Sequence, residues 1–167
     1  MSHSQRRIID LSLPVDTNLP RADVQPFKSI ETDGWNATTL HLYSHCGTHM
    51  DAPRHFLPEG QTLDQLCLQA CCGVARIVNL APVVPSELIT LERFQAAIDD
   101  EFQPGERLLL RTDWHHCFPS SEYRDALPRV SLELARWLVS QQVRLIGVEP
   151  PSVADVNNPV ELTEVHQ

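Results

Sequence analysis

The chain has 167 residues, of which 42% are hydrophobic and 21% charged, and its formal net charge is −9 at pH 7. This length suits one domain around one core, so we expect residues 1–167 to form a single domain. The sequence has no apolar run near the roughly 20 residues that span a bilayer. It also has no Lys/Arg cluster of the kind that binds nucleic acid or anionic membranes. We therefore expect a small-molecule substrate, and neither nucleic acid nor a membrane as partner.

The N-terminal sequence and the cysteines indicate a reducing compartment. MSHSQRRIID carries two arginines but no apolar stretch of about 7 to 15 residues, the core of a secretory signal. The five cysteines show no repeated C-x-x-C spacing, and the neighbours Cys71 and Cys72 are awkward disulfide partners. We expect a cytoplasmic protein with reduced thiols.

Two strands are predicted in the N-terminal third. Residues 7–11 (RIIDL) are rich in β-branched side chains, and residues 38–43 alternate between two faces. The segment SHCGTHMDAPRHF follows the second strand. Its Gly47 and Pro53 interrupt any helix, which predicts a loop at a strand end, where functional residues often lie.

Strands and helices alternate in the rest of the chain. Compact apolar runs at residues 74–80, 107–111 and 143–148 predict inner strands. Thr90 and Ser131 can each cap a helix between these strands. The apolar stripes of the two helices are Leu91, Phe94 and Ile98 in the first, and Leu134, Trp137 and Leu138 in the second. This pattern predicts an α/β fold.

Four residues able to bind a metal or to move a proton fall within the predicted loop. They are His45, His49, Asp51 and His55, in the order H-x3-H-x-D-x3-H. Imidazoles together with a carboxylate form a borderline N/O site that suits Zn²⁺ or Mn²⁺, and they leave coordination positions open for water. Thr48 is placed to hold one of these ligands by a hydrogen bond.

The whole string from residue 45 to residue 55, HCGTHMDAPRH, resembles the cyclase-family signature H-x-G-T-H-x-D-x-P-x-H at every fixed position. IIDLSLPV, LLLRTDW and LIGVEPPSV resemble further strands of that family, so the resemblance covers nearly the whole chain. It implies a mixed β-sheet core with flanking helices, and a homodimer whose sites lie near the interface.

The resemblance also implies roles for individual residues. His45, His49 and Asp51 correspond to metal ligands, His55 to the catalytic acid/base, and His166 to a ligand of a second metal ion.

The family pattern continues past His166 to a metal-binding glutamate, which this sequence does not reach. We therefore expect an incomplete second site, a domain without the family's C-terminal segment, and a weakened or inactive hydrolase. Glu161 and Glu164 are the neighbouring carboxylates, and neither shares the direction of His166 on a helix.

The family includes bacterial kynurenine formamidases, so the resemblance implies hydrolysis of a carbon–nitrogen amide bond. N-formylkynurenine would give formate and kynurenine. The N-terminal LPVDTNLPRADVQPF lacks the tryptophan in a Pro-Gly-Asp neighbourhood that those enzymes tend to carry. The alternatives are an isatin hydrolase-like opening of a cyclic amide, and a non-catalytic metal-binding or interaction protein with the same fold.

Several other polar or aromatic residues are weaker candidates. A second polar cluster, Asp113, His115, His116 and Cys117, is more simply a solvated loop than a ligand set. Cys46 occupies a variable position of the signature, and we expect it to pack rather than to act as a nucleophile.

Glu149 and Ser152 follow a predicted strand, in a turn that the family places near the site. They are candidates for contacting substrate or for supporting a ligand, and are otherwise turn residues. Trp35 and Trp114 are candidates for lining a pocket for an aromatic substrate, although tryptophan is more often part of a core.

Overall fold

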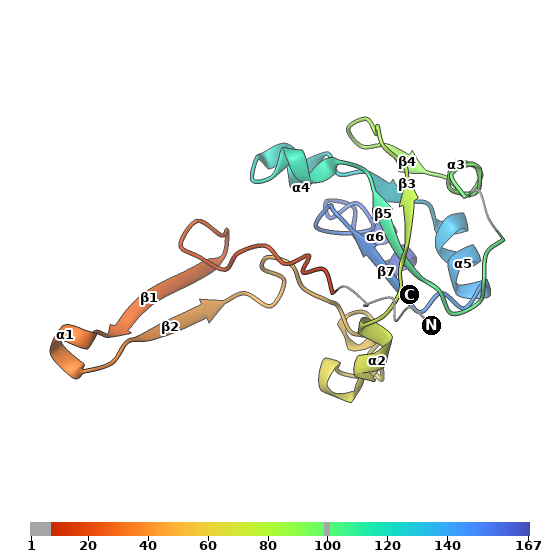
Figure 1. Ribbon diagram of the computed structural model, residues 1–167. Coiled ribbons are helices and arrows are strands. Elements are labelled where there is room, and N and C mark those ends of the chain that lie inside the picture. Colours follow the sequence, from red (N-terminus) through yellow and green to blue (C-terminus); the bar gives the residue numbers. More distant parts are fainter. Residues whose placement is uncertain (1–7, 99–100) are drawn as a thin grey trace, which may run out of the picture. The chain divides into compact units, whose positions relative to one another are not determined.

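The computed structural model describes residues 8–98 and 101–167 and divides the chain into two compact units, Met1–Asp51 and Ala52–Gln167 (Figure 1). No helix among the described residues combines the length and the apolar character needed to cross a membrane.

The first unit is built on an antiparallel hairpin. Strand β1 (Ala22–Lys28) pairs with β2 (Ala37–Leu42), and the short helix α1 (Ile30–Asp33) lies between them. Strand β2 confirms the prediction at residues 38–43 with a shift of one residue. Strand β1 was not predicted, because Asp23, Gln25 and Pro26 weaken the β-strand signal. Pro26 pairs with Thr38 just before an irregularity in the register.

The strand predicted at residues 7–11 is wrong over the described part, Ile8–Leu11, which belongs to no strand; Arg7 lies outside the described residues. A β-branched composition gives only a local preference, and a strand also needs a hydrogen-bonded partner. Here the Thr48 hydroxyl supplies partners to the segment instead. It accepts from the Leu13 amide at 2.9 Å and donates to the Leu11 carbonyl at 3.5 Å.

The core of the second unit is a parallel sheet with the order β3-β5-β7 (Figure 1). The strands are β3 (Arg76–Asn79), β5 (Arg107–Arg111) and β7 (Leu145–Val148), and all three lie within the predicted apolar runs. Strands β4 (Leu88–Ile89) and β6 (Arg129–Val130) form a second, shorter parallel pair. The α/β fold class is confirmed, with the parallel and antiparallel pairs in separate sheets.

Both predicted helices are confirmed, and they cover the core. Helix α3 (Leu91–Ala96) begins at Thr90, and α5 (Leu132–Ser140) begins at Ser131. The hydroxyl of each cap accepts a hydrogen bond from the backbone amide three residues later, at 3.2 Å and 3.1 Å respectively. The buried cluster that joins these helices to the sheet is Val78, Leu80, Ile89, Phe94, Leu108, Leu110, Val130, Leu134 and Leu138.

Six further short helices complete the described part of the second unit. They are η1 (Pro53–His55), η2 (Leu63–Gln65), α2 (Leu68–Cys71), η3 (Trp114–Cys117), α4 (Ser121–Asp125) and α6 (Pro159–His166). Two of them end at a predicted site residue: η1 ends at His55 and α6 ends at His166.

Candidate metal centre

The loop after β2 is shaped by Gly47. Its φ of 62° lies in the left-handed region that glycine adopts without strain. A Cβ at this position would also lie 3.1 Å from Leu19 Cδ2, closer than most such contacts. Gly47 lies between His45 and His49, whose side chains converge on the same side of the loop.

Three side-chain atoms converge in this loop. His45 Nδ1 lies 3.2 Å from His49 Nε2 and 3.0 Å from Asp51 Oδ1, and His49 Nε2 lies 3.7 Å from the same carboxylate oxygen. Atoms that each lie about 2.0 to 2.2 Å from one tetrahedral zinc ion are about 3.3 to 3.6 Å apart. The three separations bracket that range, so this donor set fits a divalent cation.

The hydrogen bonds of the loop fix the tautomer of His49. Its Nδ1 lies 3.0 Å from the Gly47 carbonyl oxygen. Because a carbonyl can only accept, Nδ1 carries the proton, and the lone pair of the neutral ring is on Nε2. That is the atom that faces His45 and Asp51. The backbone therefore orients His49 for metal binding before any ion arrives.

Partial exposure of the three side chains suits an open catalytic centre. The exposed fractions are 27% for His45, 23% for His49 and 40% for Asp51. A structural zinc site closes all four positions with protein ligands, whereas a catalytic site leaves at least one for water or substrate. Three potential ligands at one edge of the loop would correspond to the second case.

Thr48 has a different role from the one predicted. Its hydroxyl is engaged by the backbone of Leu11 and Leu13, so it ties the N-terminal segment to the loop. It stabilises the loop rather than a single metal ligand.

The second unit brings His55 and His166 together around one aromatic ring. The Phe56 ring stacks on His166, with centroids 4.2 Å apart and an interplanar angle of 21°. His55 meets the same ring at 4.5 Å in a T-shaped arrangement of 75°. The residues predicted as the proton-transfer group and the second metal ligand are therefore neighbours in space, although they are far apart in sequence.

The carboxylates near His166 have distinct positions. Glu161 accepts from Arg129 at 2.8 Å through Oε2 and from the Asp155 amide at 3.2 Å through Oε1. Glu164 is exposed. Glu161 therefore holds α6 against Arg129 of β6.

A second group of potential ligands lies at the carboxyl ends of β5 and β7. Within the described ranges, residues 8–98 and 101–167, His45, His49 and Asp51 form one group whose ligand atoms lie within 4.8 Å of one another, and Asp113, His115 and Glu149 form the other. His116 and Cys117, which the sequence placed with Asp113 and His115, are not members of the second group.

The hydrogen bonds of this second group indicate a structural role. Glu149 Oε2 accepts from the Thr112 amide, the Thr112 hydroxyl and the Trp114 amide, at 3.0, 2.7 and 2.9 Å. Arg111 donates two hydrogen bonds to Asp113, and these hold the pKa of that carboxyl below its usual value. Glu149 therefore organises the turn after β5. Sequence analysis missed this role because the residues involved are far apart in the chain.

A search of protein families matches residues 9–155 to the family described as putative cyclase. The chain belongs to this family. Kynurenine formamidases of Bacillus thuringiensis (strain Al Hakam) and Bacillus cereus are each 32% identical over 166 residues, which cover 95% of this chain and 75% of each relative. The predicted cyclase-family membership is confirmed.

Solved structures show the same fold at lower sequence identity. Isatin hydrolase A from Ralstonia solanacearum has a TM-score of 0.81 and 19% identity, and the match covers 96% of this chain and 74% of that one. A predicted metal-dependent hydrolase from Bacillus stearothermophilus has a TM-score of 0.71 and 19% identity, over 95% and 76% of the two chains. These likenesses confirm the expected family fold.

Two tryptophans of this cyclase-family chain were considered for a substrate pocket. Trp114 is only 5% exposed, and its Nε1 donates to the Tyr123 carbonyl at 3.0 Å. It is therefore a core residue with a satisfied polar atom, the alternative that the sequence left open. Trp35 is 56% exposed and follows α1 in the first unit.

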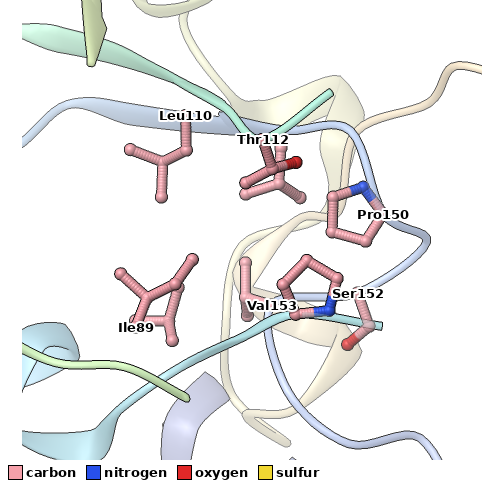
Figure 2. Close-up of a pocket in the computed structure, with 9 residues that line it drawn as sticks. Ile89, Leu110, Thr112, Pro150, Ser152 and Val153 are labelled. Atoms are coloured by element: carbon pink, nitrogen blue, oxygen red, sulfur yellow. The ribbon is translucent and has the colours of Figure 1, made fainter. Parts of the chain in front are cut away.

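The pocket at the carboxyl end of the sheet is too small for a substrate. It measures ≈ 10 Å³, room for about one water molecule. Figure 2 shows Thr112 and Ser152 among apolar neighbours at its walls. The Ser152 hydroxyl accepts from the Ala154 amide at 3.1 Å, so Ser152 shapes the turn after β7.

We predict that His49→Ala lowers zinc affinity by more than about 100-fold, beyond the 10- to 100-fold typical of residues that only orient a ligand. The reason is that one of three converging donors is lost. His41→Ala is the matched control, because His41 is an exposed histidine on β2 of the same unit. Zinc titration of both variants measures the effect. Equal affinity of the His49 variant and the native protein would contradict the ligand assignment.

Proposed function

We propose that this chain is a metal-dependent hydrolase of a carbon–nitrogen amide bond, with N-formylkynurenine as its substrate and formate and kynurenine as products. The observation that carries the proposal is the convergence of His45 Nδ1, His49 Nε2 and Asp51 Oδ1 in a half-exposed loop. The identity of 32% to curated kynurenine formamidases, over 95% of the chain, supports the choice of reaction and substrate.

The residues of the first unit would hold the ion. His49 is oriented by the Gly47 carbonyl, and Asp51 supplies the negative charge that partly balances a divalent cation. The two imidazoles and one carboxylate suit Zn²⁺ or Mn²⁺. A bound ion would supply Lewis acidity, which polarises the amide carbonyl and makes water a better nucleophile near neutral pH.

We assign proton transfer to His55. This residue ends η1, whose first residue, Pro53, has a fixed φ that restricts the approach to the histidine. Imidazole is the side chain best matched to accept a proton from attacking water and to donate it to the departing nitrogen near neutral pH. In N-formylkynurenine that nitrogen belongs to an arylamine, which leaves more readily than an aliphatic amine.

The choice of substrate is tested by assaying N-formylkynurenine and isatin side by side with zinc-loaded and manganese-loaded protein. We expect faster hydrolysis of N-formylkynurenine. Preference for isatin would instead favour the cyclic-amide alternative, which the fold shared with isatin hydrolase A supports. Stoichiometric metal without hydrolysis of either substrate would overturn the enzymatic proposal and favour a metal-binding protein.

Replacing His55 by alanine should lower kcat by about 10²- to 10⁴-fold, the usual contribution of a general acid/base. Most of the bound metal should remain, because His55 is assigned to proton transfer rather than to coordination. His116→Ala is the control, since His116 is exposed in the same unit and is not a member of a candidate ligand group. Parallel loss of metal from the His55 variant would redefine this residue as a ligand.

We also propose that the protein is a homodimer in which the hairpin packs against a second copy. Within residues 8–51, Leu19 is the one buried hydrophobic residue. An isolated two-stranded hairpin is marginally stable in water. Val24 and Leu40 are paired in register on one face of the hairpin, and Leu42 follows on the same side. Leu40 is 53% exposed and Leu42 is 47% exposed.

The cytoplasmic location stays a prediction.

Light scattering should give twice the monomer mass of 18.9 kDa for the native protein. Leu40→Asp should shift the distribution toward monomer, because it introduces a charge into the apolar face. Thr39→Asp places the same charge on the opposite face of β2, across from the neutral Gln25, and should leave the dimer intact. A native protein that is monomeric at every concentration would rule out this arrangement.

A further inference from the structure

Phe56 contacts both His55, to which the proposed function assigns proton transfer, and His166, which the sequence predicts as a metal ligand. Phe56 is half-buried, and its ring stacks on His166 with the ring centroids 4.2 Å apart. Its centroid lies 4.5 Å from that of the His55 ring, with an interplanar angle of 75°. The backbone of Phe56 is also fixed, because its amide donates to the Pro53 carbonyl at 3.2 Å and closes η1. One side chain thus contacts both rings from a fixed position.

The His166 ring is held from two directions. Its Nδ1 lies 2.6 Å from the Leu162 carbonyl oxygen, one helical turn earlier, so Nδ1 carries the proton. In the neutral ring Nε2 then carries the lone pair that coordination to a metal requires. The hydrogen bond sets the direction in which Nδ1 of the His166 ring points, and the stack on Phe56 sets the plane of that ring.

The stack on Phe56 adds a contact at the C-terminal end of helix α6. None of its residues is buried. Its first turn is held by the Asn158 cap and by the ion pair between Glu161 and Arg129 at 2.8 Å. The stack on Phe56 acts at the opposite end, where helices commonly fray. Without it, the last turn of α6 and the His166 ring would lose a flat surface that restricts their rotation.

We propose that Phe56 is a positioning residue of the hydrolase site, setting the ring planes of His55 for proton transfer and of His166 for metal coordination. This inference rests on the proposed function. Its physical basis is that aromatic rings in contact prefer offset-stacked or edge-to-face geometries. An aliphatic side chain of similar volume would fill the space but would not impose a plane.

The experiment compares Phe56→Leu, which removes the ring, with Phe56→Tyr, which keeps it. The control is Phe118→Leu, because Phe118 is another half-buried phenylalanine of the second unit. Its ring makes a T-shaped pair with Tyr123, with centroids 5.3 Å apart and an interplanar angle of 82°. Thermal unfolding checks that all variants fold. Two measurements follow: the ¹H–¹³C imidazole spectrum of the metal-free proteins, and kcat of the zinc-loaded proteins with N-formylkynurenine.

We expect Phe56→Leu to shift the imidazole resonances of both His55 and His166, because it removes the ring current of the phenyl group. It should also lower kcat by about 3- to 10-fold, in line with the contribution of an aromatic pair. Phe56→Tyr should restore both readouts, and Phe118→Leu should leave both unchanged.

Unchanged His55 and His166 resonances in folded Phe56→Leu would overturn the placement of the ring. If Phe56→Leu shifts the resonances but has the same kcat as an active native enzyme, the positioning role of Phe56 is overturned. If the native protein has no hydrolase activity, the proposed function fails. In that case a zinc titration takes the place of kcat, and equal zinc affinity of native protein and Phe56→Leu overturns the inference.

Discussion

Burial of β5 between β3 and β7 is the constraint on which the second unit depends. Leu108 and Leu110 are at most 2% exposed, so the strand must be paired along both edges and covered by helices. Where the chain leaves the sheet after β5, its amides lose their ladder partners. The Glu149 carboxylate, at the end of β7, supplies replacements. The same residue's carbonyl accepts from the Tyr123 hydroxyl at 2.6 Å. Burial and the nearby Glu149 charge both raise the pKa of Tyr123.

The candidate metal loop follows a different principle, because it does not rely on a large apolar core. A glycine in the left-handed region shapes the loop, a backbone carbonyl orients His49, and a threonine hydroxyl ties the loop to the N-terminal segment. His45 Nδ1 and Asp51 Oδ1 lie 3.0 Å apart. Imidazole and carboxylate groups bind metal in their deprotonated forms, so metal binding at such a site is coupled to proton release.

Sequence predicted the features that are local. Strand β5 coincides with its apolar run, both helix caps lie at the expected residues, and the dense H-x3-H-x-D spacing predicted the convergence of its side chains. It did not predict contacts between distant segments. The ties from Thr48 to Leu13, from Glu149 to Thr112 and from Phe56 to His166 have no periodicity or composition that could indicate them. The strand prediction was wrong for residues 8–11 for the same reason, because a strand also needs a second segment to pair with, and the sequence of residues 8–11 does not reveal one.

The placement of the indole rings gives each unit its own optical reporter. Trp35 is more than half exposed in the first unit, whereas Trp114 is buried in the second and Trp137 packs against Phe94 and Phe102. Iodide in solution can collide with an exposed indole but not with a buried one. Fluorescence quenching therefore follows the surroundings of the hairpin separately from those of the sheet. Because a shielded indole emits at shorter wavelength than one in water, the emission of Trp114 should move to longer wavelength when the core of the second unit opens.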